Sequence, residues 1–201
     1  MTRRPPKTYD RAYYDRWYRD PRTRIADAAD LRRRAAHLLA TAELLLERPA
    51  RTALDVGCGE ARWRAPLIAL RPRLRYLGLE TSPYAIARFG ARRNVREGSF
   101  GSLAKIRGRR FDVIVCADVL HYLSPAEIDA GLAALPGLLD GIAYLDATAR
   151  EDRPSGDLHG WISRPASWYT ERFERAGLVN CGMMCWCGPE RAERLGAMER
   201  R

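Results

Sequence analysis

Apolar residues follow two alternating patterns along this chain. Short, continuous apolar runs alternate with longer segments in which apolar residues return every three or four positions. The runs predict buried strands, and the longer segments predict amphipathic helices. Strands are expected at 52–56, 74–80, 94–97, 111–116, 141–146 and 178–186. Because the first five alternate with helices, the pattern predicts an α/β fold with a parallel sheet that is covered on both faces.

Several predicted helices have clear start and stop signals. Ser82 is placed as an N-cap, with proline at the first helical position after it. Ser124 begins a later helix, Glu127 is placed to complete a capping box, and Pro136 is expected to end this helix. Ahead of the first strand, the apolar spacing predicts a long helix over 27–47.

An aromatic segment, 9–21, precedes that long helix. Tyr9, Tyr13 and Trp17 are four residues apart and would share one side of a helix. This side could pack on the domain or could close as a lid over a bound ligand, and both interpretations remain open. We expect residues 1–50 to form an N-terminal arm and helical cap, residues 51–188 the core, and residues 189–201 a charged tail.

Length and composition fit one globular domain. The chain has 201 residues, and 46% of them are apolar, which suits a single α/β core. No apolar run reaches the ~18 residues that cross a bilayer, and no apolar segment follows the basic N-terminus, which argues against a secretory signal. Five cysteines, an odd number, do not suggest a disulfide framework. We therefore expect a cytoplasmic protein with no membrane partner, as a monomer or a homodimer.

The net charge of +10 permits a nucleic-acid partner. The arginines, however, are spread along the whole chain instead of forming one block. A dedicated nucleic-acid surface is therefore not favoured.

The segment 53–63 is the most informative part of the chain. It is apolar up to Val56, contains Gly57 and Gly59, and then takes on a helical pattern. Glycines leave no side chain between the backbone and a ligand, and they adopt positive φ readily. The segment therefore predicts a strand, a tight turn and a helix start, which could hold a ligand near backbone N–H groups. An ordinary strand-to-helix turn is the alternative.

Glu80 ends the second predicted strand. An acid at this position can accept hydrogen bonds from both hydroxyls of a ribose. The alternative is an acid that caps the next helix. The third glycine of a dinucleotide-binding turn is absent, since Arg62 occupies that position. The pattern therefore favours a ribose-containing ligand without a pyrophosphate.

Four motifs together resemble the class I S-adenosylmethionine-dependent methyltransferases. The segment Leu54-Asp55-Val56-Gly57-Cys58-Gly59 is similar to the first motif of that family. Its second, third and fourth motifs have counterparts in Leu79-Glu80-Thr81-Ser82, Glu97-Gly98-Ser99-Phe100 and the segment 111–123. The resemblance covers about residues 51–147 in the family's order, and it implies a Rossmann-like, doubly wound and mostly parallel sheet.

The resemblance also implies a cofactor, S-adenosyl-L-methionine, and the product S-adenosyl-L-homocysteine. It implies that the glycine turn surrounds the methionine part, that Glu80 holds the ribose, and that residues after the third and fourth strands lie beside the adenine and the sulfonium. The implied cofactor-binding residues are Asp55, Gly57, Cys58, Gly59, Glu80, Thr81, Ser99, Phe100, Ala117 and Asp118. The aromatic segment would be the family's variable cap, with Tyr9, Tyr13 or Trp17 on cofactor or substrate.

Two histidines are candidate catalytic bases. His121 follows the fourth strand, and His159 lies in the loop after the fifth, where Trp161 is a candidate substrate contact. A base is needed only if the methyl acceptor carries a proton. The alternative for His121 is a packing role at a helix start.

The last predicted strand carries Cys181, Cys185 and Cys187, whose even spacing would place all three thiols on one face. Without a paired Cys-x-x-Cys, small buried side chains are favoured over a metal site, and no metal is expected.

The function expected from these observations is methyl transfer to the oxygen or nitrogen of a small molecule. An RNA methyltransferase and a protein that binds S-adenosylmethionine without catalysis are the alternatives. An enclosed aromatic cavity near 117–122 would favour the small molecule, and a basic strip there would favour nucleic acid.

Overall fold

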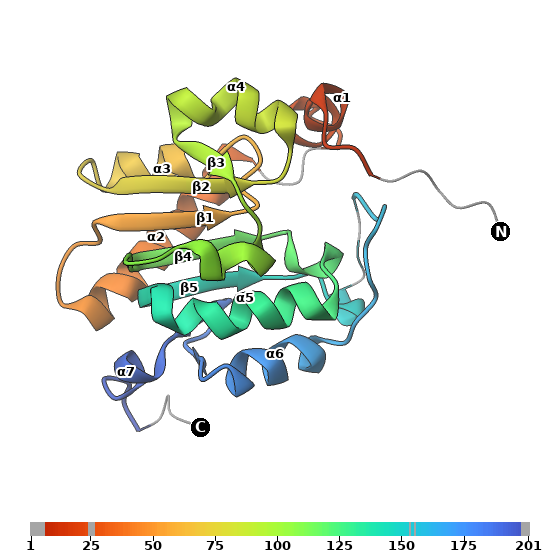
Figure 1. The fold of residues 1–201 in the computed structure, drawn as a ribbon. Coiled ribbons are helices and arrows are strands. Elements are labelled where there is room, and N and C mark those ends of the chain that lie inside the picture. The colour runs from red at the N-terminus through yellow and green to blue at the C-terminus, as the bar shows by residue number, and fades with distance from the viewer. Residues whose placement is uncertain (1–6, 24–26, 153, 155, 198–201) are drawn as a thin grey trace.

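The computed structural model describes residues 7–23, 27–152, 154 and 156–197. A seven-stranded sheet has helices on both of its faces (Figure 1). The strands are β1 (Thr52–Val56), β2 (Arg75–Glu80), β3 (Val95–Glu97), β4 (Phe111–Ala117), β5 (Leu139–Asp146), β6 (Val179–Asn180) and β7 (Cys185–Cys187). Their order is β3-β2-β1-β4-β5-β7-β6, and β1 to β5 are parallel.

The helices fall into two layers. The α-helices are α1 (Arg11–Tyr14), α2 (Ala28–Leu46), α3 (Arg64–Leu70), α4 (Pro83–Arg93), α5 (Pro125–Leu138), α6 (Ala166–Arg175) and α7 (Pro189–Ala192), and the shorter turns are η1 (Asp15–Arg19), η2 (Phe100–Lys105), η3 (Leu120–Tyr122) and η4 (Arg150–Asp152). One apolar core lies between the sheet and α2, α3 and α4, and the other lies between the sheet and α5, α6 and η2.

Side-chain caps explain where the main helices begin. Ser82 Oγ accepts from the Ala85 N–H at the start of α4, and Ser124 and Glu127 form the expected capping box at α5. The predicted end of α5 at Pro136 is wrong, because the helix continues to Leu138. Pro136 lies in the last turn, and Leu135 and Leu138 are buried there against the sheet, so packing outweighs the local cost of proline.

The single strand predicted over 178–186 is also wrong. The segment is a hairpin, in which β6 pairs antiparallel with β7, and β7 pairs antiparallel with β5. Gly182, Met183 and Met184 all have positive φ in the connecting turn. The two methionines are not typical of such a turn, so the sequence carried no clear signal for it.

The topology brings the functional segments together. Strand order reverses between β1 and β4, where crevices form at the carboxyl ends of parallel strands. Figure 1 shows α1 lying at this same end of the sheet. None of the described helices is both long and apolar enough to cross a membrane.

Candidate active site

The glycine turn after β1 is built for close contact. Gly57 and Gly59 have φ of +69° and +53°. A Cβ on Gly57 would lie 2.4 Å from Val119 Cγ2, and one on Gly59 would lie 2.7 Å from Tyr18 Oη. Larger residues are therefore excluded by both conformation and space.

The N–H groups of this turn are used within the protein. Gly57 and Cys58 both donate to the Leu79 carbonyl, at 2.8 and 3.0 Å, and Gly59 donates to Glu80 Oε2 at 2.6 Å. Helix α3 begins only at Arg64. The N–H groups of residues 57–59 are therefore not free to bind a ligand. A ligand can instead lie directly on the glycine backbone, which no side chain covers.

Glu80 links the turn to the end of β2. Besides the Gly59 N–H, its carboxylate accepts from the N–H groups of Thr81 and Ser82, at 2.8 and 2.9 Å. The side chain is buried, yet it lines the same pocket as the glycines. The Thr81 hydroxyl, 3.4 Å from Oε1, is a fourth donor to this carboxylate. Oε2 accepts from Gly59 alone, so this oxygen retains acceptor capacity for a ligand hydroxyl. Both interpretations of Glu80, backbone anchor and ribose acceptor, are compatible with this geometry.

Two further acids face the pocket. Asp55 accepts a hydrogen bond of 2.6 Å from the Tyr76 hydroxyl, and burial raises its pKa to about 7. Asp118, which follows β4 with φ of +58°, is open to the pocket but otherwise enclosed by protein, and this burial raises its pKa. Both carboxyls would gain charge stabilisation from a cationic ligand.

The remaining predicted cofactor residues also line the pocket. They are Cys58, Thr81, Ser99, Phe100 and Ala117. The Phe100 ring, however, packs so tightly against α5 that a Cβ on Gly131 would lie 2.2 Å from it. Phe100 therefore also packs this wall of the pocket against α5.

An arm of residues 7–20 covers the pocket. Asp10 caps α1 through the Tyr13 N–H, and the chain then widens into the π-helical turn η1. Ser82 Oγ donates to the Tyr9 carbonyl at 2.6 Å, Arg19 pairs with Glu60, and Tyr14 stacks on Tyr84.

The structure places the predicted aromatic residues of the arm differently from one another. Tyr9 and Tyr13 line the pocket, whereas Trp17 is not among its lining residues and has the Arg16 guanidinium over its ring. Tyr14 and Tyr18 line the pocket instead. The expected four-residue spacing assumed one regular helix from Tyr9 onward, but the helix begins at Arg11 and widens after Tyr14.

His121 lies at the pocket with a defined tautomer. Its Nδ1 accepts from the Thr148 N–H at 3.1 Å, so in the neutral ring the proton is on Nε2. Burial, together with the positive charge of Lys7, lowers the pKa of His121 to about 4. Neutral His121 can thus donate from Nε2, but it has no free nitrogen with which to accept a proton.

The loop after β5 brings Trp161 and Asp157 to the pocket. Trp161 Nε1 donates to the Thr148 carbonyl at 3.1 Å. His159 is not among the residues that line the pocket, and its backbone N–H donates to Asp157 Oδ1. Asp157, Arg62 and Trp63 also line the pocket. They are not predictable as binding residues, because single residues in loops carry no periodic signal.

The three cysteines near the C-terminus come from two segments but pack on the same apolar core. Cys181 lies after β6, while Cys185 and Cys187 belong to β7. Cys185 Sγ lies 3.5 Å from His37 Nε2. Among the described residues, no group of histidines, cysteines and acids has the arrangement of a metal site.

Part of the chain matches the model of a known family. Residues 54–140 match the model of a family described as a methyltransferase domain. This match covers the glycine turn, Glu80, and the ends of β3 and β4. The matched segment and the shared fold support a class I S-adenosylmethionine-dependent methyltransferase. The Rossmann-like fold expected from the sequence is thereby confirmed, and the match to a methyltransferase domain supports the expected family and cofactor.

Solved structures of methyltransferases share this fold. The sugar N-methyltransferase KedS8 from Streptoalloteichus sp ATCC 53650 has a TM-score of 0.59 at 19% identity, over 89% of this chain and 87% of that one. A SAM dependent methyltransferase from Archaeoglobus fulgidus has a TM-score of 0.61 at 12% identity, over 84% and 74%.

A third similar structure contains S-adenosyl-L-homocysteine. It is the O-methyltransferase from the trans-AT PKS multienzyme of Brevibacillus brevis, with a TM-score of 0.51 at 17% identity. The match covers 75% of this chain and 55% of that one, so this chain spans about half of its length. No curated protein matches the sequence.

Proposed function

We propose that this methyltransferase transfers a methyl group to the oxygen or nitrogen of a small molecule. The observation that carries the proposal is the covered aromatic pocket at the carboxyl ends of β1, β2 and β4. Four tyrosines of the arm form one of its walls, namely Tyr9, Tyr13, Tyr14 and Tyr18. A wall of rings that closes over the cofactor site suits an acceptor that is enclosed on all sides.

The pocket residues fit the cofactor. Gly57 and Gly59 leave open backbone that a Cβ would fill, Glu80 has acceptor capacity for the ribose, and Asp55 and Asp118 gain from nearby positive charge. Arg62, whose guanidinium lies 5.4 Å from the Tyr18 ring centroid, would hold the cofactor's carboxylate. We assign Thr81 and Ser99 to the adenine side.

The protein contributes to methyl transfer by positioning the acceptor against the cofactor. When bound, S-adenosylmethionine supplies a methyl group in one displacement, in which the acceptor's lone pair bonds to the methyl carbon while the carbon–sulfur bond breaks and its electrons stay on sulfur. Alignment of the reacting groups accounts for much of the acceleration in such a step. His121 would donate a hydrogen bond from Nε2 to the acceptor, and its pKa of about 4 keeps it neutral at physiological pH.

The pocket is small for two ligands. Its volume is about 220 Å³, below the ~300–1,000 Å³ usual for sites of drug-sized ligands. The arm would therefore move outward when cofactor and acceptor enter, as active-site lids do. This supports the lid interpretation of the aromatic segment.

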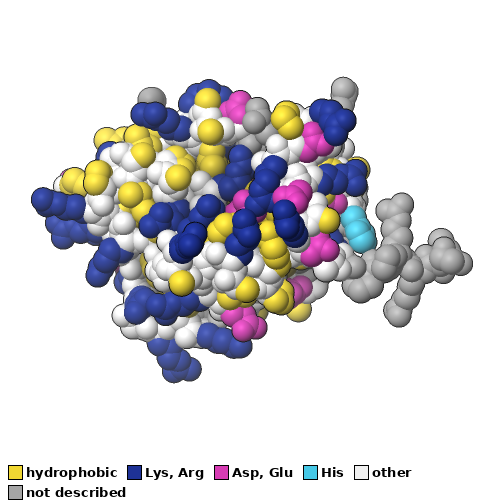
Figure 2. All heavy atoms as spheres, turned by 90° about the horizontal axis from the view of Figure 1, so that it is seen from above, with side chains coloured by type: hydrophobic (Ala, Val, Ile, Leu, Met, Phe, Trp, Pro, Cys, Tyr) yellow, Lys and Arg dark blue, Asp and Glu magenta, His cyan; other side chains and the backbone are white. Residues whose placement is uncertain are grey.

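The charge distribution supports a small acceptor over RNA. Figure 2 shows Lys and Arg side chains scattered over the face that carries α4, with acidic side chains among them. Of the described residues that line the pocket, Arg62 is the one arginine, whereas Asp55, Glu80, Asp118 and Asp157 are acids. Such a mouth would repel a phosphate backbone. None of the five cysteines forms a disulfide, which fits the proposed cytoplasmic location.

Methyl transfer from labelled S-adenosylmethionine tests the proposal. The intact protein is incubated separately with a metabolite extract and with total RNA, and labelled products are identified by mass spectrometry. We expect label in a low-molecular-weight product. Label in RNA would favour the nucleic-acid alternative. Cofactor binding without label in either fraction would favour a non-catalytic binding protein.

A further inference from the structure

Lys7 is buried in a cage of three tyrosines and one carboxylate. Its Nζ lies 3.6 Å from the Tyr122 ring centroid, 5.0 Å from that of Tyr9 and 5.3 Å from that of Tyr13. The Asp157 Oδ2 atom lies 2.6 Å away. The two charged side chains are only 11% and 7% exposed. An aromatic cage with a carboxylate is the arrangement that recognises organic cations.

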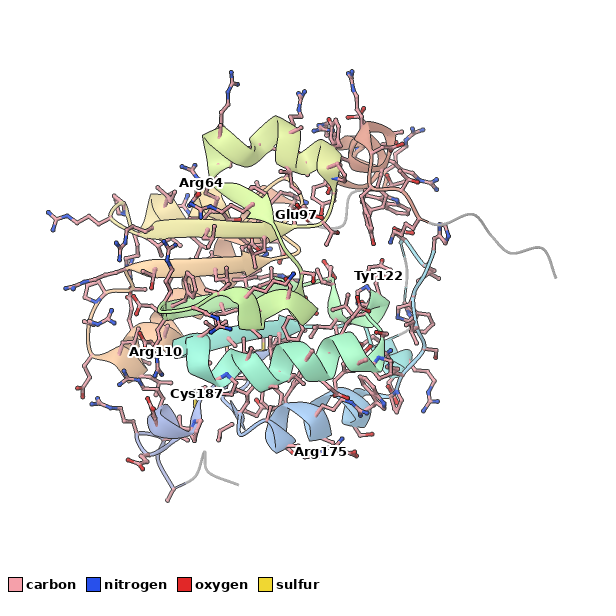
Figure 3. All side chains as sticks on the ribbon, viewed as in Figure 1. Arg64, Glu97, Arg110, Tyr122, Arg175 and Cys187 are labelled. Atoms are coloured by element: carbon pink, nitrogen blue, oxygen red, sulfur yellow. The ribbon has the colours of Figure 1, made fainter. Side chains whose placement is uncertain are left out.

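The cage is assembled from segments far apart in sequence. Tyr9 and Tyr13 come from the arm, Tyr122 from η3 after β4, and Asp157 from the loop after β5. The Tyr122 hydroxyl donates to the Asp157 carbonyl at 2.7 Å, which fixes these two relative to each other. Figure 3 labels Tyr122 at the end of the sheet where the arm lies.

The cage belongs to the acceptor side of the pocket. All four of its residues line the same pocket as Gly57, Glu80 and Asp118. The Tyr122 ring is also in edge contact with His121, at 4.2 Å between centroids. An ammonium ion in this cage therefore sits beside the end of β4, where acceptor and cofactor would meet.

The position of Lys7 differs from that of an ordinary structural ion pair. Neither its Nζ nor Asp157 Oδ2 has a hydrogen bond of good geometry among the described residues, so charge and the ring faces hold the pair. The arm is already fastened by the Ser82 bond to the Tyr9 carbonyl and by the Arg19 pair with Glu60. The ammonium can therefore leave the cage while the arm keeps these contacts.

We propose that the cage of Tyr9, Tyr13, Tyr122 and Asp157 is the subsite for the amino group of an aliphatic amine acceptor, and that Lys7 occupies it when the acceptor is absent. The inference rests on the proposed function and narrows it to N-methylation. Lys7 then acts as an internal stand-in for the acceptor, because it presents the same primary ammonium group.

The environment also suits the chemistry of an amine. An ammonium ion has no lone pair, so the acceptor must release one proton to water before it can take a methyl group. Burial lowers the pKa of Lys7 despite the opposing charge of Asp157, and it would act in the same way on a bound acceptor. Methylation of the neutral amine yields a positively charged N-methylammonium product, with which Asp157 can still pair.

Binding of n-butylammonium, measured by calorimetry without cofactor, tests this subsite. The Lys7→Ala variant empties the cage and should bind n-butylammonium at least tenfold more tightly than the wild type. The neutral probe 1-pentanol should show no such gain. The matched control is Lys105→Ala, which removes the chain's other lysine, exposed in η2, and should behave as the wild type does. Adding Asp157→Asn to Lys7→Ala should abolish the gain.

Two results would overturn the inference. One is equal binding of n-butylammonium by the wild type and by folded Lys7→Ala. The other is an equal gain in affinity for 1-pentanol in Lys7→Ala, which would indicate an apolar cavity without selectivity for a cation. If Lys7 only anchors the arm, Lys7→Ala should speed hydrogen exchange in residues 9–18 and should not bind n-butylammonium, which would also contradict the inference. S-adenosyl-L-homocysteine affinity, measured separately, reports on the proposed function, so the two failures are distinguishable.

Discussion

The two walls of the pocket are built in different ways. The inner wall, at the ends of β1, β2 and β4, is set by backbone geometry, since the Leu79 carbonyl and the Glu80 carboxylate accept from the N–H groups of the glycine turn. The outer wall, made of the arm and the loop after β5, is set by side chains such as Tyr14, Tyr18 and Asp157. The inner wall can therefore keep its shape while the outer wall opens, which is what a site that must admit two ligands requires.

The largest effect is expected when Glu80 is removed from the inner wall. Glu80→Ala deletes the carboxylate that accepts from three N–H groups and that we assign to the ribose. S-adenosylmethionine should bind more weakly by on the order of 1.5–3 kcal/mol, which is roughly 10- to 150-fold in Kd. Titration calorimetry measures this change.

Glu97→Ala is the matched control for Glu80→Ala. Glu97 ends the neighbouring strand in register with Glu80, but it is exposed (Figure 3). Its removal should leave the cofactor Kd unchanged. Equal affinities for wild type and folded Glu80→Ala would refute the ribose assignment.

A smaller effect is expected where the two walls touch. Gly59→Ala places a Cβ 2.7 Å from the Tyr18 hydroxyl at a φ of +53°. Gly108→Ala has a similar φ, +65°, but no atom within 4 Å. Each variant should lose about 1–2 kcal/mol of unfolding free energy from the backbone conformation, measured by urea denaturation. Only Gly59→Ala should also weaken cofactor binding, and a matching loss in Gly108→Ala would argue against the contact.

The smallest effect is expected from pH, which should change the affinity for the cofactor. Burial raises the pKa of Asp55 to about 7 in the cofactor-free protein, so below pH 7 the group is mostly protonated. The cationic cofactor favours the carboxylate and should expel this proton. The affinity for the cofactor should therefore rise with pH, by at most about tenfold per pH unit. The rise should end at about pH 7, above which the affinity stays constant.

Asp146→Asn is the control for the pH test. Burial raises the Asp146 pKa to about 6, but this residue is not among those that line the pocket. The variant should retain the pH dependence of binding, whereas Asp55→Asn should lose it. Calorimetry at pH 6 in two buffers of different ionisation enthalpy measures the released proton. No proton release would place the cationic part of the cofactor away from Asp55.

Local signals made the inner wall predictable from the sequence. Glycines after a strand, an acid that ends the next strand and serines ahead of a helix are recognised from the residues next to them, so positions 57, 59, 80, 82 and 124 are predictable from the sequence. The outer wall depends on contacts between distant segments, such as the pair of Lys7 with Asp157. The helix of the arm also widens at η1. As a result, Tyr18 lines the pocket and Trp17 does not. No spacing rule in the sequence announces such a change.

Hydrogen exchange measured by mass spectrometry, with and without S-adenosyl-L-homocysteine, tests the central claim that the cofactor lies between the two walls. Without ligand, amides of the arm should exchange faster than those of β1, because side-chain contacts hold the arm, whereas β1 is hydrogen-bonded between two neighbouring strands. With ligand, exchange should slow both at the glycine turn, residues 54–60, and in the arm, residues 9–18. Protection of one wall alone, or of neither, would contradict the account.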